Sequence, residues 1–363
     1  MRIVFSGGGT GGHIFPAIAV AQEIQKRFPN VEILFVGADG KMEMTKVPKA
    51  GYPIKGLWIS GFQRKLSIRN LLFPIKLLSS SISSYFILRR FKPDVVAGFG
   101  GYASGATLYV ASLMGIPILI QEQNSFPGIT NKLLASRAEK IAVAYDKAKK
   151  YFPIDKVVVT GNPIRSSLLE IAGRNKGVKH FGLDPSKKTV LIIGGSLGAR
   201  TLNIGMRNNL KAIESLSDIQ FIWQCGSLYI DEYYRSETAQ LEHVQIMAFI
   251  DDMNLAYATA DIVVSRAGAL SVSELCAQGK ATILVPSPNV AEDHQTKNAL
   301  ALVEKNAALT IKDAEFSNEF ISLVTQLVHD TGTMSRLENN ISQLAMPRAV
   351  EHIADELLKL VKS

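Results

Sequence analysis

The chain has 363 residues, about twice an ordinary domain length, so two domains are expected. Its composition, 47% apolar and 20% charged, excludes a chain that is disordered as a whole. Cys225 and Cys276 lie outside any Cys-x-x-Cys spacing, which excludes a disulfide scaffold and a zinc ribbon and suits a reducing compartment. Residues 1–6 read as a strand and not as a signal peptide, and there is no apolar run of about 18 residues. We therefore expect a soluble cytoplasmic protein.

Short β-rich apolar runs alternate with helical patterns along the chain, which predicts parallel α/β units. In the first half the expected strands are 3–5, 33–36, 95–97, 116–120, 141–144 and 157–160. In the second half they are 190–193, 221–224, 244–248, 262–265, 282–285 and 308–310. Each half opens with a strand, a glycine-rich turn and a helix. Two doubly wound, Rossmann-like domains facing across a cleft are therefore expected, with ligands at the carboxyl ends of the strands.

The expected domains are residues 1–161 and 162–340. Their junction is near 161–165, where Pro163 should end the preceding strand. Residues 341–363 are expected to contain a helix, from about 348 to 361, that packs back on the N-terminal domain.

The net charge of +8 is concentrated in the first half. Residues 1–163 carry 21 Lys/Arg against 9 Asp/Glu, a net of +12, and residues 164–363 carry 19 against 23, a net of −4. Residues 44–93 contain ten basic side chains and no acidic one. This pattern suits a polyanionic surface, either nucleic acid or an anionic bilayer, and is equally compatible with a basic face kept for solubility.

The apolar content of residues 68–91 favours the bilayer over nucleic acid. A helix that is apolar on one side and fringed by Lys/Arg fits the plane of a membrane interface, whereas nucleic-acid grooves require basic residues with a few stacking aromatics. The structural alternative is a core helix packed on a sheet, and both can hold for different faces. We expect an anionic membrane surface, and no nucleic acid, as a partner.

The first glycine turn places Gly7, Gly9 and Gly12 in the G-x-G-x-x-G spacing, which lets a phosphate approach the backbone at a helix N-terminus. One interpretation is a dinucleotide oxidoreductase with Asp39 on a ribose, and another is a purely structural turn. The extra glycine and histidine of residues 10–13, together with a second glycine turn in the other half, count against the oxidoreductase.

His13 lies at this helix start, where the cationic form is disfavoured, so a neutral imidazole able to accept a proton is plausible. The alternative is a histidine that caps the turn. A metal site at His294 has no second spaced His or Cys set, and Asp251–Asp252 has no Asp-x-Asp spacing, so no metal is expected.

Ser271 and Glu274 form a capping-box pattern, which is the structural interpretation of this segment. The functional alternative places Glu274 at the mouth of the cleft, where a carboxylate can accept from two sugar hydroxyls. Arg165, at the junction, could contact a diphosphate or a base edge, or form a salt bridge at the hinge.

Eight motifs, in order and at compatible spacing over nearly the whole chain, resemble the MurG family of bacterial N-acetylglucosaminyltransferases. They are Gly8-Gly-Thr-Gly-Gly-His13, Gly100-Gly-Tyr-Ala-Ser-Gly105, Glu122-Gln-Asn124, Gly161-Asn-Pro-Ile-Arg165, Gly194-Gly-Ser-Leu-Gly-Ala-Arg200, Phe249-Ile-Asp-Asp-Met253, Gly268-Ala-Leu-Ser-Val-Ser-Glu274 and Asp293-His-Gln295. The departures are small: Ser271 stands where threonine is frequent in the family, and Ala17 where glycine is frequent.

The resemblance implies the GT-B glycosyltransferase fold and inverting transfer of N-acetylglucosamine from UDP-N-acetylglucosamine to undecaprenyl-diphospho-muramoyl-pentapeptide (lipid I). It implies a peripheral protein at the cytoplasmic face of the inner membrane, with the donor bound by the C-terminal domain and lipid I by the N-terminal one. The implied substrate-binding residues are Thr10, Gly11, Gly12, Asn124, Arg165, Ser196, Ile250, Ala269, Leu270, Ser271, Val272, Ser273, Glu274 and Gln295.

The residue types at these positions fit that chemistry. Transfer to a hydroxyl needs a base for the acceptor and stabilisation of the departing UDP. Ser196 and the second glycine turn can hold the diphosphate of UDP, and the first turn can face that of the acceptor. Such helix termini can replace a divalent ion, so no cofactor is expected. Ile250 would offer backbone groups to uracil, Glu274 a ribose contact, and Asn124 and Gln295 sugar contacts. His13 is the first choice as base, with Glu122 and Tyr102 as rivals.

Overall fold

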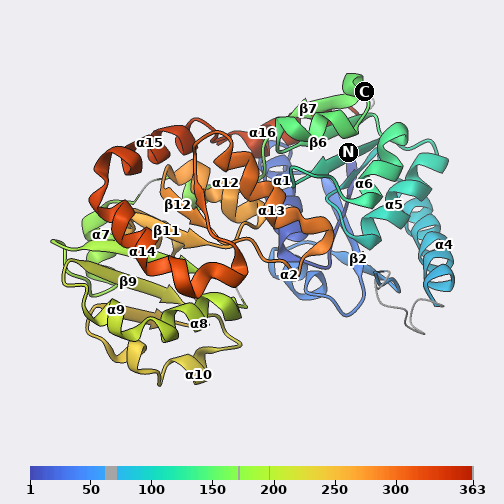
Figure 1. The fold of residues 1–363 in the computed structure, drawn as a ribbon. Helices are drawn as coiled ribbons and strands as arrows, with labels where there is room; N and C mark the ends of the chain where they lie inside the picture. The colour runs from blue at the N-terminus through green and yellow to red at the C-terminus, as the bar shows by residue number, and fades with distance from the viewer. Residues whose placement is uncertain (62–71, 171, 196, 362–363) are drawn as a thin grey trace. The chain divides into compact units, whose positions relative to one another are not determined.

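The computed structural model describes residues 1–61, 72–170, 172–195 and 197–361 (Figure 1). These residues form two compact units. Unit 1 comprises Met1–Ile164 and Met346–Ser363, and unit 2 comprises Arg165–Ala345. The boundaries expected from the sequence, 161 and 340, lie a few residues before the positions at which the two units divide.

Unit 1 is built on a seven-stranded parallel sheet in the order β3-β2-β1-β4-β5-β6-β7. Its strands are β1 (Arg2–Ser6), β2 (Glu32–Ala38), β3 (Ile54–Leu57), β4 (Val95–Gly98), β5 (Ile118–Glu122), β6 (Lys140–Val143) and β7 (Val157–Val159). Its helices are α1 (Gly11–Arg27), α2 (Glu43–Lys49), α4 (Phe73–Phe91), α5 (Tyr102–Leu113), α6 (Ile129–Leu134) and α16 (Ala349–Leu358). Because the strand order reverses between β1 and β4, the carboxyl ends of these two strands form a switch point at which such folds bind ligands.

Alternating side chains of β1 divide the core of unit 1 into two layers. Ile3 and Phe5 lie in a cluster with buried residues of α1 and α16, whereas Val4 lies in a cluster with buried residues of α5. The C-terminal helix α16 is held on α1 by Ile353 and Leu357, which are fully buried, and by an ion pair of 2.5 Å between Arg27 and Asp355. The helix therefore completes the core of the unit that contains the first glycine turn.

Unit 2 repeats this plan with a six-stranded parallel sheet in the order β10-β9-β8-β11-β12-β13. Its strands are β8 (Lys188–Ile193), β9 (Ile219–Gln224), β10 (Val244–Met247), β11 (Ile262–Ser265), β12 (Ala281–Leu284) and β13 (Leu309–Thr310). Its helices are α7 (Arg174–His180), α8 (Arg200–Asn208), α9 (Leu210–Glu214), α10 (Ile230–Tyr233), α11 (Met253–Thr259), α12 (Ala269–Gln278), α13 (His294–Val303), α14 (Phe316–His329) and α15 (Thr331–Ser342). The switch point of this sheet lies between β8 and β11.

The fold-class prediction of two doubly wound parallel α/β domains is confirmed, and each of the twelve expected strands overlaps an observed one. Strand β3 has no counterpart among the strands expected from the sequence. This strand is short, lies at the edge of its sheet and contains Lys55 and Gly56, so it lacks the apolar run that identifies the buried strands.

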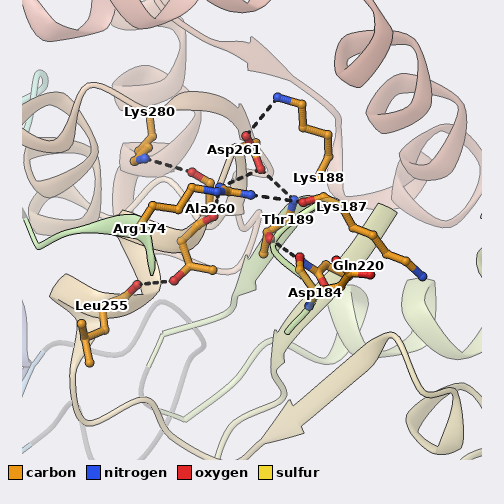
Figure 2. A network of polar contacts seen from close by, with 11 residues as sticks. Arg174, Asp184, Lys187, Lys188, Thr189, Gln220, Leu255, Ala260, Asp261 and Lys280 are labelled. Atoms are coloured by element: carbon orange, nitrogen blue, oxygen red, sulfur yellow. Dashed lines mark hydrogen bonds and ion pairs between the residues drawn. The ribbon is translucent and has the colours of Figure 1, made fainter. Parts of the chain in front are cut away.

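A polar network joins the amino ends of β8 and β11 in unit 2 (Figure 2). The Asp261 carboxylate accepts hydrogen bonds from Arg174 at 3.0 Å, from Lys188 at 3.2 Å and from the backbone N–H of Thr189 at 2.8 Å. Beside it, Lys280 donates to the carbonyl oxygen of Ala260 at 2.9 Å, and burial lowers the pKa of Lys280. The network fixes the two central strands at the end opposite their glycine-containing loops, which leaves the carboxyl ends for a ligand.

Candidate active site

Two glycine turns from neighbouring strands touch in unit 1. Residues 7–12 follow β1, and Gly100–Gly101 follow β4. Gly100 and Gly101 have φ values of +92° and +87°. A Cβ at Gly101 would lie 2.5 Å from the carbonyl oxygen of Gly8, and one at Gly100 would lie 2.8 Å from Cδ2 of the His13 ring. Both positions therefore need glycine, because any side chain would displace the first turn or the imidazole.

The His13 imidazole is oriented by the turn that precedes it. Its Nδ1 lies 2.8 Å from the carbonyl oxygen of Gly8 and 3.2 Å from the hydroxyl of Thr10, and the side chain is half-buried. Because a carbonyl oxygen can only accept, the contact with Gly8 assigns the proton to Nδ1. The neutral ring then has Nε2 as its proton acceptor.

The Glu122 carboxylate accepts hydrogen bonds on both of its oxygens. It lies at the end of β5 with 2% of its surface exposed, and it accepts from the backbone N–H groups of Asn124 and Gly128, at 2.9 and 3.1 Å, and from the Asn131 side chain at 2.7 Å. The Asn124 amide also donates to it, at 3.2 Å. With both oxygens accepting hydrogen bonds, this carboxylate is arranged to hold the loop after β5.

Tyr102 begins α5 and is 49% exposed, and its ring lies so close to Gly61 that a Cβ on that glycine would overlap it.

Buried amides lie beneath the loop that contains Asn124. Gln121 donates to the Asn162 side chain at 3.1 Å, and Asn162 donates to the carbonyl oxygen of Gln123 at 3.0 Å. These contacts fix the 161–164 segment to the end of β5.

Glu43, at the start of α2, is a site residue that the sequence analysis did not identify. It is fully buried, and Oε1 and Oε2 each lie 3.1 Å from the backbone N of Gly9. Oε1 also accepts from Ala38 N–H at 3.0 Å. A Cβ at Gly8 would overlap this carboxylate. No motif spacing identifies such a residue, since its partners are backbone groups.

The second glycine turn follows β8 in unit 2. Gly195 and Gly198 have φ values of +84° and +85°, and a Cβ at Gly198 would overlap the carbonyl oxygen of Cys225. The Gln224 side chain donates to the carbonyl oxygen of Gly195 at 2.8 Å and to that of Ala248 at 3.4 Å. It thereby ties the turn to the loop that contains Ile250, which is 3% exposed. Ser196 lies outside the described residues.

Glu274 on α12 is paired with two side chains. Arg165 donates to Oε1 at 3.1 Å, and the hydroxyl of Tyr257 donates to Oε2 at 3.3 Å. Burial raises the pKa of Glu274, and Arg165 and Tyr257 act in the opposite direction. Burial also raises the pKa of Tyr257 well above its usual value, so its hydroxyl remains a donor.

The capping-box interpretation of Ser271 and Glu274 is wrong. Helix α12 begins at Ala269 with Gly268 as its N-cap, so Ser271 already lies inside the first turn. Ala269, Leu270, Ser271, Val272, Ser273 and Glu274 are thus consecutive helical residues, and Val272 is buried. The first turn of this helix presents backbone N–H groups that have no acceptor within the helix.

Gln295 lies on α13, which follows an unusual backbone segment. Glu292 and Asp293 have φ values of +53° and +54°, a conformation that costs free energy in residues with a side chain. The Gln295 amide oxygen accepts from the backbone N–H of Ser287 at 2.9 Å. This hydrogen bond fixes the side chain against the loop after β12.

The described candidate residues thus form two groups, each on its own unit and near the carboxyl ends of that unit's strands. Thr10, Gly11, Gly12, His13, Tyr102, Glu122 and Asn124 belong to unit 1, and Arg165, Ile250, Ala269–Glu274 and Gln295 belong to unit 2. Within the described ranges, no group of three or more His, Cys, Asp and Glu side chains is arranged to hold a metal ion.

Helix α4 exposes several large apolar side chains along one side. Its buried residues are Ser80, Ser84 and Leu88, and the Ser80 hydroxyl donates to the carbonyl oxygen of Trp58 at 3.1 Å. We call the opposite stripe the α4 face; it consists of Ile75, Leu78, Ile82 and Phe86, which are 50–63% exposed. The core-helix alternative is therefore confirmed for the inner side, where Leu88 joins the core of unit 1 with Ile87 and Phe91 packed against it, and is wrong for the α4 face. None of the helices in the described part of the chain is long and apolar enough to cross a bilayer.

Comparison with known proteins agrees with this architecture. A model of the glycosyltransferase family 28 N-terminal domain matches residues 3–143, and one of the glycosyltransferase family 28 C-terminal domain matches residues 189–354. The chain is similar over its whole length to curated relatives named UDP-N-acetylglucosamine–N-acetylmuramyl-(pentapeptide) pyrophosphoryl-undecaprenol N-acetylglucosamine transferase. It is 54% identical to that of Flavobacterium psychrophilum, covering 100% of this chain and 98% of the relative, and 50% identical to that of Bacteroides fragilis, covering 100% and 96%.

Solved structures show the same fold. Acinetobacter baumannii MurG superposes with a TM-score of 0.78 at 29% identity over 99% of both chains. A UDP-GlcNAc 2-epimerase from Neisseria meningitidis shares the fold, with a TM-score of 0.69 at 16% identity, over 99% of this chain and 100% of the epimerase. The two parallel α/β units together with the two family-28 matches define a glycosyltransferase of the GT-B type. The chain belongs to glycosyltransferase family 28 and, within it, to the MurG family.

Proposed function

We propose that this chain transfers N-acetylglucosamine from UDP-N-acetylglucosamine to the muramoyl sugar of lipid I, forming lipid II with inversion at the anomeric carbon. The observation that carries the proposal is the 54% identity over 100% of the chain to a relative named for this transfer. Both units keep a glycine turn at the switch point of their sheet, which is where such folds bind diphosphates.

The donor half of the reaction is assigned to unit 2. The Glu274 carboxylate, held by Arg165 and Tyr257, is proposed to accept hydrogen bonds from the ribose hydroxyls of UDP. The backbone around Ile250 is proposed to bind uracil. The first turn of α12 and the 194–198 turn, including Ser196, are proposed to stabilise the charge of the departing diphosphate. Gln295 is proposed to contact the transferred sugar.

The acceptor half is assigned to unit 1. His13 Nε2 takes the proton from the acceptor hydroxyl while that oxygen attacks the anomeric carbon and the bond to the UDP oxygen breaks, so UDP departs with the electron pair. Thr10, Gly11 and Gly12, at the start of α1, are proposed to face the diphosphate of lipid I. Asn124 is proposed to bind a sugar hydroxyl.

The two rival residues keep other roles in this proposal. Glu122 already accepts four hydrogen bonds, so we assign it the positioning of the Asn124 loop rather than proton transfer. Tyr102, exposed at the start of α5 beside the first glycine turn, is assigned to acceptor contact. Protein N–H groups supply the positive potential in this scheme, and no bound cofactor takes part in it.

We further propose that the α4 face docks on an anionic membrane surface, at the cytoplasmic side of the inner membrane where lipid I would be reached. An amphipathic helix that lies in a bilayer interface combines an exposed apolar stripe with flanking basic side chains. The α4 face has that stripe, and Arg89 and Arg90 lie in the last turn of the same helix. Ser80 and Ser84 on its inner side let the helix pack closely on α5, while the four residues of the α4 face remain exposed.

Release of UDP by the purified chain tests the transfer. With a lipid I analogue present, UDP-N-acetylglucosamine should support saturable UDP release and UDP-glucose much less, and NADPH should neither bind nor be oxidised. Saturable binding of NADPH without UDP release would instead support the oxidoreductase interpretation of Gly7, Gly9 and Gly12. Vesicle binding without UDP release, in the presence of both substrates, would indicate a membrane-bound scaffold.

A further inference from the structure

One peptide group links the buried Glu43 carboxylate to the His13 ring. The N–H of Gly9 donates to Glu43, with its nitrogen 3.1 Å from each carboxylate oxygen. The carbonyl oxygen of Gly8, which belongs to the same peptide group, accepts from His13 Nδ1 at 2.8 Å. A carboxylate, one amide and the imidazole thus form a continuous chain of hydrogen bonds.

The burial of Glu43 indicates a specific requirement for this carboxylate. A charged group without solvent is costly unless hydrogen bonds compensate, and here backbone N–H groups of Gly9 and Ala38 do so. Space for it depends on glycines, because a Cβ at Gly8 would overlap its oxygens and one at Gly37 would lie 2.6 Å from its Cγ. A leucine or methionine would fill the same volume without that cost if packing were the only need.

The chain of hydrogen bonds has a direct consequence for His13. A negative charge at the N–H end of an amide polarises it and makes its carbonyl oxygen a stronger acceptor. The Gly8 oxygen then holds Nδ1–H more firmly, which selects the neutral tautomer whose lone pair is on Nε2 and fixes the ring plane. When Nε2 receives a proton, the polarised carbonyl also stabilises the positive charge that develops on the ring.

We propose that Glu43 is a positioning residue for the reaction, acting on His13 through the Gly8–Gly9 peptide group. The inference rests on the proposed role of His13 as the base. It assigns a task to a carboxylate outside the eight recognised motifs, comparable to that of a carboxylate that orients a catalytic imidazole directly. Here an amide stands between the two groups, and Glu43 itself exchanges no proton with the substrate.

The variant Glu43→Gln separates the charge of this residue from its shape. The amide oxygen of glutamine can still accept from Gly9 and Ala38, so the turn keeps its support while the negative charge is lost. We expect kcat to fall about tenfold, as is common when a group supporting a functional ligand is changed. The KM for UDP-N-acetylglucosamine should stay unchanged. The KM for the acceptor should stay unchanged or fall, because a negative charge beneath a diphosphate-binding turn has been removed.

Glu139→Gln is the matched control. Glu139 also accepts from a backbone N–H, that of Ile118 at 2.6 Å, but at the amino end of β5. If Glu43 serves folding alone, Glu43→Gln should behave like Glu139→Gln and lower thermal stability without a selective effect on kcat. Wild-type kcat in folded Glu43→Gln would overturn the proposal. So would losses for Glu43→Gln and His13→Gln that multiply in the double variant, because residues acting through each other are not independent.

A spectroscopic measurement keeps this inference distinct from the proposed function. The ¹⁵N shifts of the His13 ring, assigned by comparison with His13→Gln, should report Nδ1–H in the wild type and a changed Nδ1 shift in Glu43→Gln. Identical His13 shifts in the two proteins would overturn the link even if both variants lose activity. If His13→Gln kept wild-type turnover, the base assignment would fail, and an altered Nδ1 shift in Glu43→Gln would still establish the structural link.

Discussion

The Arg165 guanidinium and the Glu274 carboxylate form an ion pair of 3.1 Å in unit 2, and the two side chains differ sharply in exposure. The Arg165 side chain is 49% exposed, whereas that of Glu274 is 13% exposed. Burial therefore has the largest influence on Glu274 and raises its pKa, although Arg165 and the Tyr257 hydroxyl oppose it. A carboxylate kept in this position weakens the fold at neutral pH, which agrees with the ligand-binding role proposed for it.

Glu274→Gln should weaken the binding of UDP-N-acetylglucosamine by about 10- to 100-fold, as expected for the loss of a hydrogen bond to a charged group. The folded pKa of Glu274 is raised, so its contribution to stability is present below the ordinary glutamate range and is lost as pH rises through the folded value. Glu274→Gln has no carboxyl group to ionise, so it does not lose stability in this way. Its thermal midpoint should therefore rise relative to the wild type as pH increases from about 4 towards neutrality.

Glu232→Gln provides the control for this comparison. Glu232 pairs with Arg207 at 3.2 Å in the same unit, but its side chain is 57% exposed, so neither donor affinity nor the pH dependence of unfolding should change appreciably. Titration calorimetry and a thermal-unfolding series in pH measure both effects. Wild-type donor affinity in Glu274→Gln would contradict the ribose assignment.

His13→Ala should lower kcat by about 10²- to 10⁴-fold, the range that a positioned general base contributes. The KM for UDP-N-acetylglucosamine should change little, because His13 is assigned to the acceptor and not to the donor. Steady-state UDP release measures both constants. His180→Ala, at an α7 histidine whose ring contacts Phe181, is the control and should behave like the wild type. Turnover of His13→Ala within a few-fold of the wild type would remove His13 from the mechanism.

Vesicle binding should depend on the α4 face. Phe86→Asp introduces a charge at a side chain that is 62% exposed, and Arg89→Glu with Arg90→Glu reverses two charges in the last turn of α4. Each basic residue near an anionic surface contributes about 1 kcal/mol, so we expect the double reversal to weaken sedimentation with anionic vesicles at least about tenfold. High salt should reduce wild-type binding, and Phe86→Asp should reduce binding at any salt concentration.

Leu228→Asp tests whether any exposed apolar residue has this effect. Leu228 is 68% exposed in unit 2, outside the α4 face, and its substitution should leave sedimentation unchanged. Equal loss of binding in Leu228→Asp and Phe86→Asp, or undiminished binding in the Arg89/Arg90 reversal, would argue against the α4 face as the docking surface.

The order of strands and glycine turns could be predicted because buried parallel strands are continuous apolar runs, and glycine is required where φ is positive or two backbones approach. The partners of individual side chains could not be predicted in this way. Glu43 stands alone in its segment, and its hydrogen bonds to Gly9 and Ala38 depend on tertiary structure. For the same reason the sequence suggested Glu122 as a rival base, although folding surrounds it with donors.

The α4 helix shows the same limit at a surface. Its sequence indicates an amphipathic helix but does not say which side is buried. Ser80, Ser84 and Leu88 lie on the buried side, where the two small serines allow close packing, and the residues of the α4 face lie on the exposed side. Periodicity identifies a helix and its stripe, whereas the neighbouring elements decide which stripe is buried.

The two cysteines should report on the opening of unit 2. Burial raises the pKa of Cys225 to about 11 and that of Cys276 to about 12, so almost no thiolate is present in the native protein near neutral pH. We expect neither to react with a thiol reagent at pH 8 until unit 2 opens. A saturating concentration of UDP-N-acetylglucosamine should slow the reaction further, because a ligand that binds the folded unit stabilises it. Glu274→Gln should lose most of this protection at the same donor concentration. Rapid labelling of both thiols in the native protein would contradict their burial, and equal protection by UDP-N-acetylglucosamine in the variant would contradict the donor contact assigned to Glu274.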